Sequence, residues 1–142
     1  LFVDALKGYA PVCLSLALHP RRPELAIAVG SAAIIGHNWT PLLGFKGGKG
    51  VATSAGVFFA LLPMPMPATM VAFALAVRFS GHISVGSMTG AAALPVAAVA
   101  LRSQTAYSIA AAVSGALIIY KHVPNIRRLM KNKELGIHGP SA

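Results

Sequence analysis

The chain alternates between long apolar stretches and short breaks of glycine, proline and charged residues. Six apolar segments result, at about 1–18, 24–40, 51–62, 66–79, 83–101 and 105–120. With a rise of about 1.5 Å per residue, a helix over 83–101 approaches the ~30 Å thickness of a bilayer core. The shorter segments 51–62 and 66–79, joined by PMPMP, are predicted to form a helical hairpin that crosses the bilayer only in part. The pattern predicts an all-α, polytopic bundle of about six full or partial transmembrane helices.

The composition supports an integral membrane protein. Hydrophobic residues make up 56% of the 142 positions and charged residues only 11%, against about 25% charged residues in an ordinary soluble domain. Most of the surface therefore cannot face water. The sequence shows no internal repeat and no low-complexity region, so residues 1–142 are interpreted as one domain.

The net charge of +9 results from twelve Lys and Arg against three acids, Asp4, Glu24 and Glu134. In a membrane protein such an excess marks cytoplasmic loops and contacts with anionic headgroups. No basic run is interleaved with aromatic residues. We therefore expect a lipid bilayer, and no nucleic acid, as a partner of this chain.

The basic residues also predict the orientation of the chain. They gather around Lys46 and Lys49 and in the tail after residue 120, with four apolar segments between. An even number of crossings places both regions on one face, which the positive-inside rule makes cytoplasmic. The turn at 78–87 and the start of the first segment return to this face. The arginines of the HPRRP loop, 19–23, are the exception and are predicted to lie outside.

The stretch GFKGGKGVAT, residues 44–53, places four glycines and two lysines in this apolar chain. A P-loop requires G-x-x-x-x-G-K-[ST], but here the spacing is one residue short and Gly50 replaces the hydroxyl residue. A looser anion site remains, made of successive N–H groups, Lys46, Lys49 and a following helix N-terminus. The alternative is a flexible basic turn that only determines topology. The residues alone leave both interpretations open.

Further hydrogen-bond donors are predicted on the same membrane face. They lie in the stretches GHNWTP, SVGS and YKHVPNIRRL and comprise His37, Asn38, Ser84, Ser87, His122, Asn125 and Arg127. Each has an ordinary alternative role, because a histidine can cap a helix, a serine can bond its own backbone, and basic residues after a helix often set topology. Their convergence with the two lysines, with almost no acids nearby, predicts a site for one or more phosphates.

Other chemistries are excluded by the same residues. Glu24 is predicted to lie outside, which excludes catalysis by paired carboxylates. The five histidines, at 19, 37, 82, 122 and 138, are scattered and no cysteine accompanies them. Metal sites in proteins need a cluster of such ligands. We therefore expect no metal and no cofactor.

Four stretches together resemble one family. They are LFVDALKGYAPV, GHNWTPLLGFKGGKGVAT, RFSGHISVGSM and YKHVPNIRRLMKNKE, in order from Asp4 to about Glu134. They resemble the bacterial membrane glycerol-3-phosphate acyltransferases that use acyl phosphate, the PlsY family. That family has a further N-terminal helix and a Ser-, Gly- and Asn-rich motif before the Asp-Leu-Lys-Gly segment. Because the chain opens without an initiator Met or a cleavable signal peptide, we expect an N-terminally incomplete acyltransferase domain that lacks this part of the phosphate site.

The resemblance implies transfer of a fatty acyl group from acyl phosphate to the 1-hydroxyl of glycerol 3-phosphate. The products are lysophosphatidic acid and phosphate, in the first step of phospholipid synthesis, on the cytoplasmic side of the bacterial inner membrane. It implies catalytic roles for His37, Lys49 and His122. Substrate contacts are implied for Asn38, Lys46, Gly47, Gly48, Gly50, Thr53, Ser84, Ser87, Asn125, Arg127 and Glu134. The alternative function is a small anion or phosphate-lipid transporter, which would need an aqueous path.

The acceptor of the hydroxyl proton is a separate question. His37 and His122 are the obvious bases, because histidine side chains titrate near neutral pH. The sequence, however, predicts no carboxylate beside either histidine that could orient it as in a catalytic triad. Acyl phosphate is already activated, and its own phosphate oxygen lies next to the carbonyl under attack. The departing phosphate is therefore the preferred acceptor. The protein would then mainly position the substrates and stabilise charge.

Overall fold

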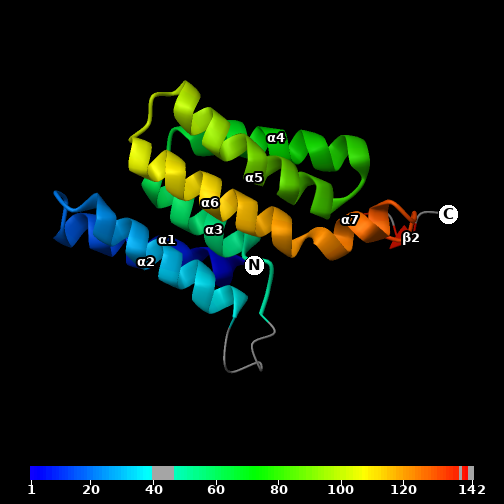
Figure 1. Cartoon of the computed structure of the whole chain (residues 1–142), viewed down its shortest axis with the longest axis horizontal. Helices are drawn as coiled ribbons and strands as arrows, with labels where there is room; N and C mark the ends of the chain where they lie inside the picture. Colours follow the sequence, from blue (N-terminus) through cyan, green and yellow to red (C-terminus); the bar gives the residue numbers. More distant parts are fainter. Residues whose placement is uncertain (40–46, 138, 141–142) are drawn as a thin grey trace.

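The computed structural model describes residues 1–39, 47–137 and 139–140 and is built almost entirely from helices (Figure 1). The helices are α1 Phe2–Leu18, α2 Pro23–Asn38, α3 Val51–Leu61, α4 Pro65–Ser80, α5 Ile83–Ala100, α6 Thr105–Lys121 and α7 Val123–Leu129. The strands β1 Leu135–Gly136 and β2 Gly139–Pro140 pair antiparallel near the C-terminus. The six long helices confirm the six predicted segments, with ends that shift by at most two residues. The hydrophobic pattern does not predict α7 or the strand pair.

Proline and glycine determine where several helices begin and end. Pro23 and Pro65 begin α2 and α4, because the fixed φ of proline suits the first helical turn and its missing N–H costs no hydrogen bond there. Gly81 ends α4 with a φ of +72°, a left-handed conformation that other residues adopt only at a cost. The breaks visible in the sequence are therefore the breaks between helices.

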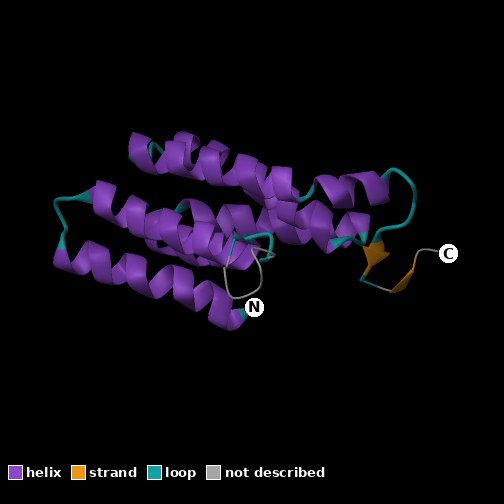
Figure 2. Cartoon of the chain, turned by 60° about the horizontal axis from the view of Figure 1, so that its bottom comes forward, coloured by secondary structure: helices purple, strands orange, loops and turns teal. Residues whose placement is uncertain are grey.

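The consecutive helices α3 and α4 pack against different partners. α3 lies mainly against α1, while α4 lies against α5, which in turn packs on α6. Figure 2 shows the long helices running side by side. The predicted hairpin of segments 51–62 and 66–79 is therefore wrong, because these two helices do not pack closely on each other.

Two glycines explain why α3 prefers α1. A side chain at Gly8 would overlap the carbonyl oxygen of Thr53, and one at Gly56 would overlap the carbonyl oxygen of Ala5. Small residues let helix backbones approach this closely inside membranes. The contact holds α3 on α1 and brings the first turn of α3 near the start of α1.

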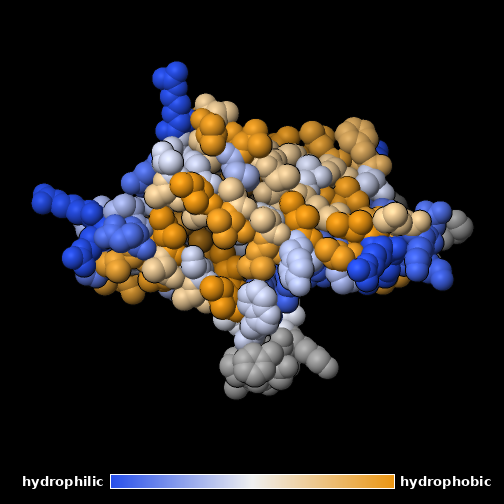
Figure 3. All heavy atoms as spheres, viewed as in Figure 1, coloured by the Kyte–Doolittle hydropathy of each residue, from blue (hydrophilic) through white to orange (hydrophobic). Residues whose placement is uncertain are grey.

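Much of the outer surface is apolar. Phe79, Val96 and Val113 are 83%, 69% and 66% exposed, and apolar residues cover much of the face shown in Figure 3. α5 is long and apolar enough to cross a bilayer. α6 and α7, which meet at a bend of 51°, are also long and apolar enough when taken together. α3 and α4 are apolar but shorter. Large exposed apolar areas are unfavourable in water, so this surface suits lipid.

The turn into α3 depends on Gly50. This buried residue precedes α3 with a φ of +76°, and a β-carbon there would lie 2.8 Å from Oδ1 of Asn38. Asn38 is the last residue of α2 and is fully buried. The end of α2 and the start of α3 are therefore in direct contact through a residue without a side chain.

Gly50→Ala is expected to destabilise the protein more than Gly81→Ala. Both glycines have a left-handed φ, so alanine carries a similar backbone strain at each position, of roughly 1–2 kcal/mol. Only Gly50 adds a collision, with Asn38, since a β-carbon at Gly81 meets no described atom within 4 Å. Thermal unfolding in detergent should give the highest midpoint for the wild type, a lower one for Gly81→Ala and the lowest for Gly50→Ala. Equal midpoints for the two variants would contradict the packing of Gly50 on Asn38.

Candidate functional site

Polar residues gather where α1, α3 and α5 begin and where α2 and α6 end. They form two groups, one on each side of residues 47–50, which we call the glycine segment. The Lys7 cluster comprises Asp4, Lys7 and His37. The Glu134 cluster comprises Ser84, His122, Asn125, Arg128 and Glu134.

In the Lys7 cluster, three side chains from α1 and α2 are in contact. Asp4 and Lys7 share one face of α1 because they lie three residues apart, and Nζ of Lys7 donates to Oδ1 of Asp4 at 2.7 Å. The same Nζ lies 2.7 Å from Nδ1 of His37, and Oδ1 of Asp4 lies 3.5 Å from that nitrogen. An ammonium group only donates, so Nδ1 accepts and Nε2 of His37 carries the proton of the neutral ring.

Nε2 of His37 faces the glycine segment. A β-carbon at Gly48 would overlap Nε2, and one at Gly47 would overlap the carbonyl oxygen of His37. An open cavity of about 450 Å³ lies here, lined by Asp4, Lys7, Ala32, Ala33, Gly36, His37, Gly47 and Gly48. The cavity presents an ammonium group and an N–H donor, which are groups that bind phosphate.

The prediction that neither histidine has a carboxylate beside it is wrong for His37. Asp4 lies next to it because the first turn of α1 meets the last turn of α2. Asp4 and Lys7 are not among the predicted site residues, although the start of the first segment is predicted to lie on the same membrane face as the site. The signal that could have identified them is a pair of opposite charges three residues apart in an otherwise apolar helix.

In the Glu134 cluster, one buried carboxylate orders the residues that follow α6. Glu134 is only 7% exposed. Nδ2 of Asn125 donates to its Oε1 at 2.5 Å, and Nε of Arg128 donates to its Oε2 at 2.6 Å. The backbone N–H of Ile137 donates to the carbonyl oxygen of Gly81 at 2.8 Å. The segment after α7 is thereby held against both α7 and the turn before α5.

The charges of this cluster act on one another. Burial raises the pKa of Glu134, but the hydrogen bonds from Asn125 and Arg128, with Ser84 close by, more than offset it and lower the pKa to about 2. Glu134 is therefore ionised at neutral pH. The pKa of Lys49 is lowered, mainly by partial burial. Of the nearby charges, Glu134 acts to raise that pKa and Arg128 acts to lower it. Lys49 thus lies within electrostatic reach of the cluster from the glycine segment.

Three polar atoms of the Glu134 cluster are available to a ligand. Nδ1 of His122 lies 2.8 Å from the carbonyl oxygen of Ile118 and must donate to it, which leaves Nε2 as an acceptor in the neutral ring. Oδ1 of Asn125 and Oγ of Ser84 are buried and have no hydrogen-bond partner among the described residues. Buried polar atoms are rarely left unpaired, so these atoms are candidate contacts for a polar ligand.

The first turn of α3 lies between the two clusters. The first N–H groups of a helix have no partner within it, and the positive end of the helix dipole favours an anion there. Thr53 and Asn38 are fully buried, and their side-chain polar atoms have no partner among the described residues. Nζ of Lys121 lies 3.4 Å from the carbonyl oxygen of Asn38 and 4.8 Å from the centre of the Trp39 ring. This arrangement can bind an anion at the first turn of α3.

Most of the predicted site residues come together here. In or between the two clusters lie His37, Asn38, Gly47, Gly48, Lys49, Gly50, Thr53, Ser84, His122, Asn125 and Glu134. Lys46 lies outside the described residues. Ser87 donates to the carbonyl oxygen of Ile83 and lines a separate apolar cavity.

The arginine that the structure places in the Glu134 cluster is not the predicted one. Arg127 is exposed, whereas Arg128 reaches Glu134, because each residue turns an α-helix by about 100° and Arg128 shares the face of Asn125. The positive-inside rule assigns Lys121 and Arg128 no role beyond topology. Their roles become visible once α6 and α7 are folded against α2 and Glu134.

Residues 1–132 match the family model described as "Glycerol-3-phosphate acyltransferase". The glycerol-3-phosphate acyltransferase of Endomicrobium trichonymphae is 40% identical over 134 residues, which are 94% of this chain and 67% of that protein. The crystal structure of PlsY (YgiH), an integral membrane glycerol 3-phosphate acyltransferase, in its glycerol 3-phosphate form matches with a TM-score of 0.89 and 31% identity over 95% of this chain and 68% of that one. The lysophosphatidic acid form of PlsY also matches with a TM-score of 0.89 and 31% identity, over 97% of this chain and 71% of that one.

These likenesses cover nearly all of this chain, which spans about two thirds of the length of the proteins it matches. They confirm the predicted fold class, an all-α integral membrane bundle. They also confirm the resemblance that the four sequence stretches indicated. The chain belongs to the glycerol-3-phosphate acyltransferase family.

Proposed function

We propose that this chain transfers a fatty acyl group from an acyl phosphate to the 1-hydroxyl of glycerol 3-phosphate, giving lysophosphatidic acid and phosphate for phospholipid synthesis. Membership of the family supports the acyltransferase activity, as do the glycerol 3-phosphate and lysophosphatidic acid forms of PlsY. The observation that carries the proposal is the arrangement of the Lys7 cluster and the Glu134 cluster on either side of the first turn of α3. One side offers donors for a phosphate, and the other offers Lys49 together with acceptors for hydroxyl groups.

The Glu134 cluster suits glycerol 3-phosphate. Its phosphate would lie against Lys49 and the first amides of α3, where charge-assisted hydrogen bonds are strongest. Oδ1 of Asn125 and Nε2 of His122 would accept hydrogen bonds from the glycerol hydroxyls, with Oγ of Ser84 nearby. Glu134 supports this arrangement because it occupies Nδ2 of Asn125 and so turns Oδ1 toward the ligand.

The Lys7 cluster suits the phosphate of the acyl donor. Nζ of Lys7 and the Nε2–H of His37 are donors beside the glycine segment. Gly47 and Gly48 pack directly against His37 and Asn38, and a backbone without side chains can approach a bound phosphate closely. The reacting groups of the two substrates would then meet at the first turn of α3.

In the proposed reaction the glycerol hydroxyl oxygen attacks the acyl carbonyl carbon. The bond from that carbon to the phosphate oxygen breaks, and the departing phosphate takes the hydroxyl proton. Lys49 and the α3 amides would stabilise the negative charge that develops on the carbonyl oxygen. His37 is poorly suited as the base, because Lys7 occupies the lone pair of its Nδ1 and its Nε2 carries a proton. His122 would bind a hydroxyl through Nε2 and help to position it.

We also propose that the site faces the cytoplasm in the bacterial inner membrane. The cations of the site, Lys7, Lys49, Lys121 and Arg128, lie where α1 and α3 begin and where α6 ends. The other basic residues of the tail follow directly. By the positive-inside rule this concentration of Lys and Arg belongs on the cytoplasmic side.

Lys49→Ala is expected to lower kcat/KM for glycerol 3-phosphate by roughly 10- to 100-fold, since a hydrogen bond to a charged group is worth about 1.5–3 kcal/mol. The assay follows phosphate release from palmitoyl phosphate in membranes that carry the protein expressed from its complete gene. Lys131→Ala, which removes an equal charge from an exposed position of the tail, is the matched control and should retain wild-type kinetics. Unchanged kinetics for Lys49→Ala would reduce the glycine segment to a topology signal.

His122→Gln is expected to raise KM for glycerol 3-phosphate while kcat changes less, because in the proposed reaction His122 binds the substrate and does not take its proton. Steady-state kinetics across a range of pH values provide the measurement. Suppose instead that kcat fell by several orders of magnitude at saturating substrate and a limb of the pH–rate profile near about pH 6.5 disappeared. Histidine would then be the base, and the departing phosphate would not be the proton acceptor.

A cysteine at Lys133 should resist a membrane-impermeant maleimide in intact spheroplasts and react after permeabilisation. Lys133 lies in the basic tail, on the face proposed to be cytoplasmic. A Cys13→Ser background removes the one native cysteine of the chain, so that the label reports a single position. Efficient labelling of intact spheroplasts would reverse the proposed orientation.

A further inference from the structure

The turn between α1 and α2 carries two arginines that the candidate site does not use. Arg21 and Arg22 lie in HPRRP, residues 19–23, beyond the end of α1 that is away from Asp4 and Lys7. α1 spans 17 residues, which corresponds to about 25 Å of helix. Figure 1 shows this turn and the α5–α6 turn at the left end of the bundle. The two arginines therefore lie at the membrane face opposite to the candidate site.

The charges of these arginines are not neutralised within the described part of the chain. Both side chains are exposed, and neither forms an ion pair with any residue that the structure describes, including Glu24 in the first turn of α2. The positive-inside rule does not account for them either, because it places Lys and Arg on the other membrane face. Two neighbouring guanidinium groups at this face therefore favour an anion from outside the chain.

The backbone beneath the arginines is fixed by a tight turn. The N–H of Arg22 donates to the carbonyl oxygen of His19 at 3.0 Å, so that Pro20 is the second residue of the turn, a position that its fixed φ suits. Pro23 then begins α2. A ligand at this turn would order two side chains but no backbone, which keeps the entropic cost of binding low.

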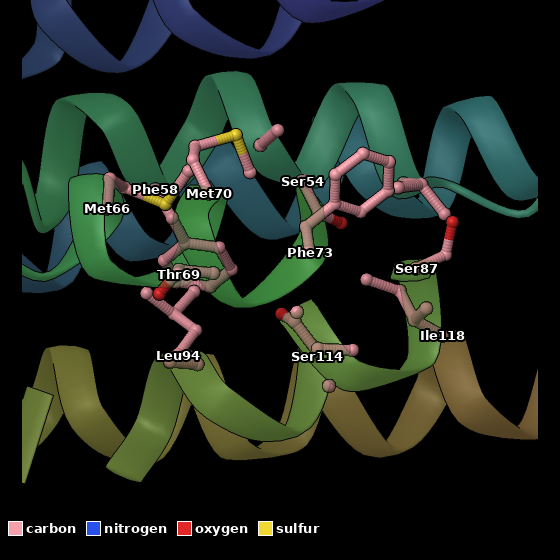
Figure 4. A pocket seen from close by; sticks show the side chains of 16 residues that line it. Ser54, Phe58, Met66, Thr69, Met70, Phe73, Ser87, Leu94, Ser114 and Ile118 are labelled. Carbon is pink, nitrogen blue, oxygen red and sulfur yellow. The ribbon is translucent and has the colours of Figure 1, made fainter. Parts of the chain in front are cut away.

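A groove opens between α1 and α2 next to this turn. It has a volume of about 400 Å³ and is lined by Pro11, Leu14, Ser15, Leu18, His19, Leu25 and Val29. Leu14 and Leu18 are 60% and 65% exposed. The stretch from Pro11 to Leu18 corresponds to about 10 Å along α1, so the groove leads from the turn into the apolar part of the bundle. It is separate from the apolar cavity shown in Figure 4, which lies among α3, α4, α5 and α6.

We infer that this groove binds an anionic phospholipid of the leaflet opposite to the candidate site. Its phosphate lies at Arg21 and Arg22, whose planar guanidinium groups match phosphate oxygens, and one of its acyl chains lies between α1 and α2. A free phosphate ion would leave the groove empty, and a zwitterionic lipid would bring a further cation to the arginines. The inference depends neither on the proposed reaction nor on which face of the bundle is cytoplasmic.

Native mass spectrometry of the detergent-solubilised protein, expressed from its complete gene, tests the inference. Wild-type protein is expected to bind dioleoyl phosphatidylglycerol more tightly than dioleoyl phosphatidylcholine, and inorganic phosphate should not displace the lipid. Arg21→Gln/Arg22→Gln should weaken the binding of phosphatidylglycerol by about tenfold or more, because two charge-assisted contacts are lost. The binding of phosphatidylcholine should change much less.

Two further variants separate the groove from a general effect of charge. Lys131→Gln/Lys133→Gln removes two exposed charges from the tail and should leave the preference for phosphatidylglycerol intact. Arg21→Lys/Arg22→Lys keeps both charges at the turn and should retain most of the preference. If the double glutamine variant does not fold, each single variant should show a smaller loss of the same kind.

Four results would overturn the inference. An unchanged preference in Arg21→Gln/Arg22→Gln would place the lipid elsewhere on the protein. Equal losses in Lys131→Gln/Lys133→Gln would show that only the net charge matters. Wild-type protein without any preference would reduce the groove to an ordinary lipid-facing surface. Loss of a dimer in place of a bound lipid would assign the groove to a second copy of this chain.

Discussion

The contact between Gly50 and Asn38 is the constraint on which the candidate site depends. Asn38 is fully buried at the end of α2, and only a residue without a side chain can lie against its amide with a φ of +76°. From α6, Nζ of Lys121 donates to the backbone carbonyl oxygen of Asn38. Three helices thus meet at the point where α3 begins. The first amides of α3 and the side chain of Lys49 take their positions from this junction.

The two clusters beside this junction use opposite charges in the same way. In one, Asp4 holds the ammonium group of Lys7, which in turn directs the proton of His37 to Nε2. In the other, Glu134 holds Asn125 through its amide nitrogen and leaves the amide oxygen for a ligand. A carboxylate in each cluster therefore orients donors and acceptors. A chain with three acids and twelve Lys and Arg thus orders its candidate site through two of those acids.

The packing of the helices links this polar site to the lipid. Gly8 and Gly56 hold α3 against α1, while α4 packs on α5. These two pairs leave a narrow apolar space between α3 and α4, which opens next to the site and ends near Met66. A tighter α3–α4 hairpin would have closed it. The same close contact that positions the start of α3 therefore also leaves this cavity beside it.

The sequence by itself determined the helices, the membrane class and the family, and it named most of the residues that the structure brings together at the candidate site. Apolar runs, prolines and glycines act locally along the chain, so their effects on helix boundaries and lipid exposure can be predicted without the fold. Only the tertiary structure decided the partner of α3, the place of Asp4 beside His37 and the contact of Arg128, and not Arg127, with Glu134. These depend on contacts between residues far apart in the chain or on the exact rotation of a short helix. Such contacts leave no periodic signal in the sequence, because they are set by how closely neighbouring backbones can approach.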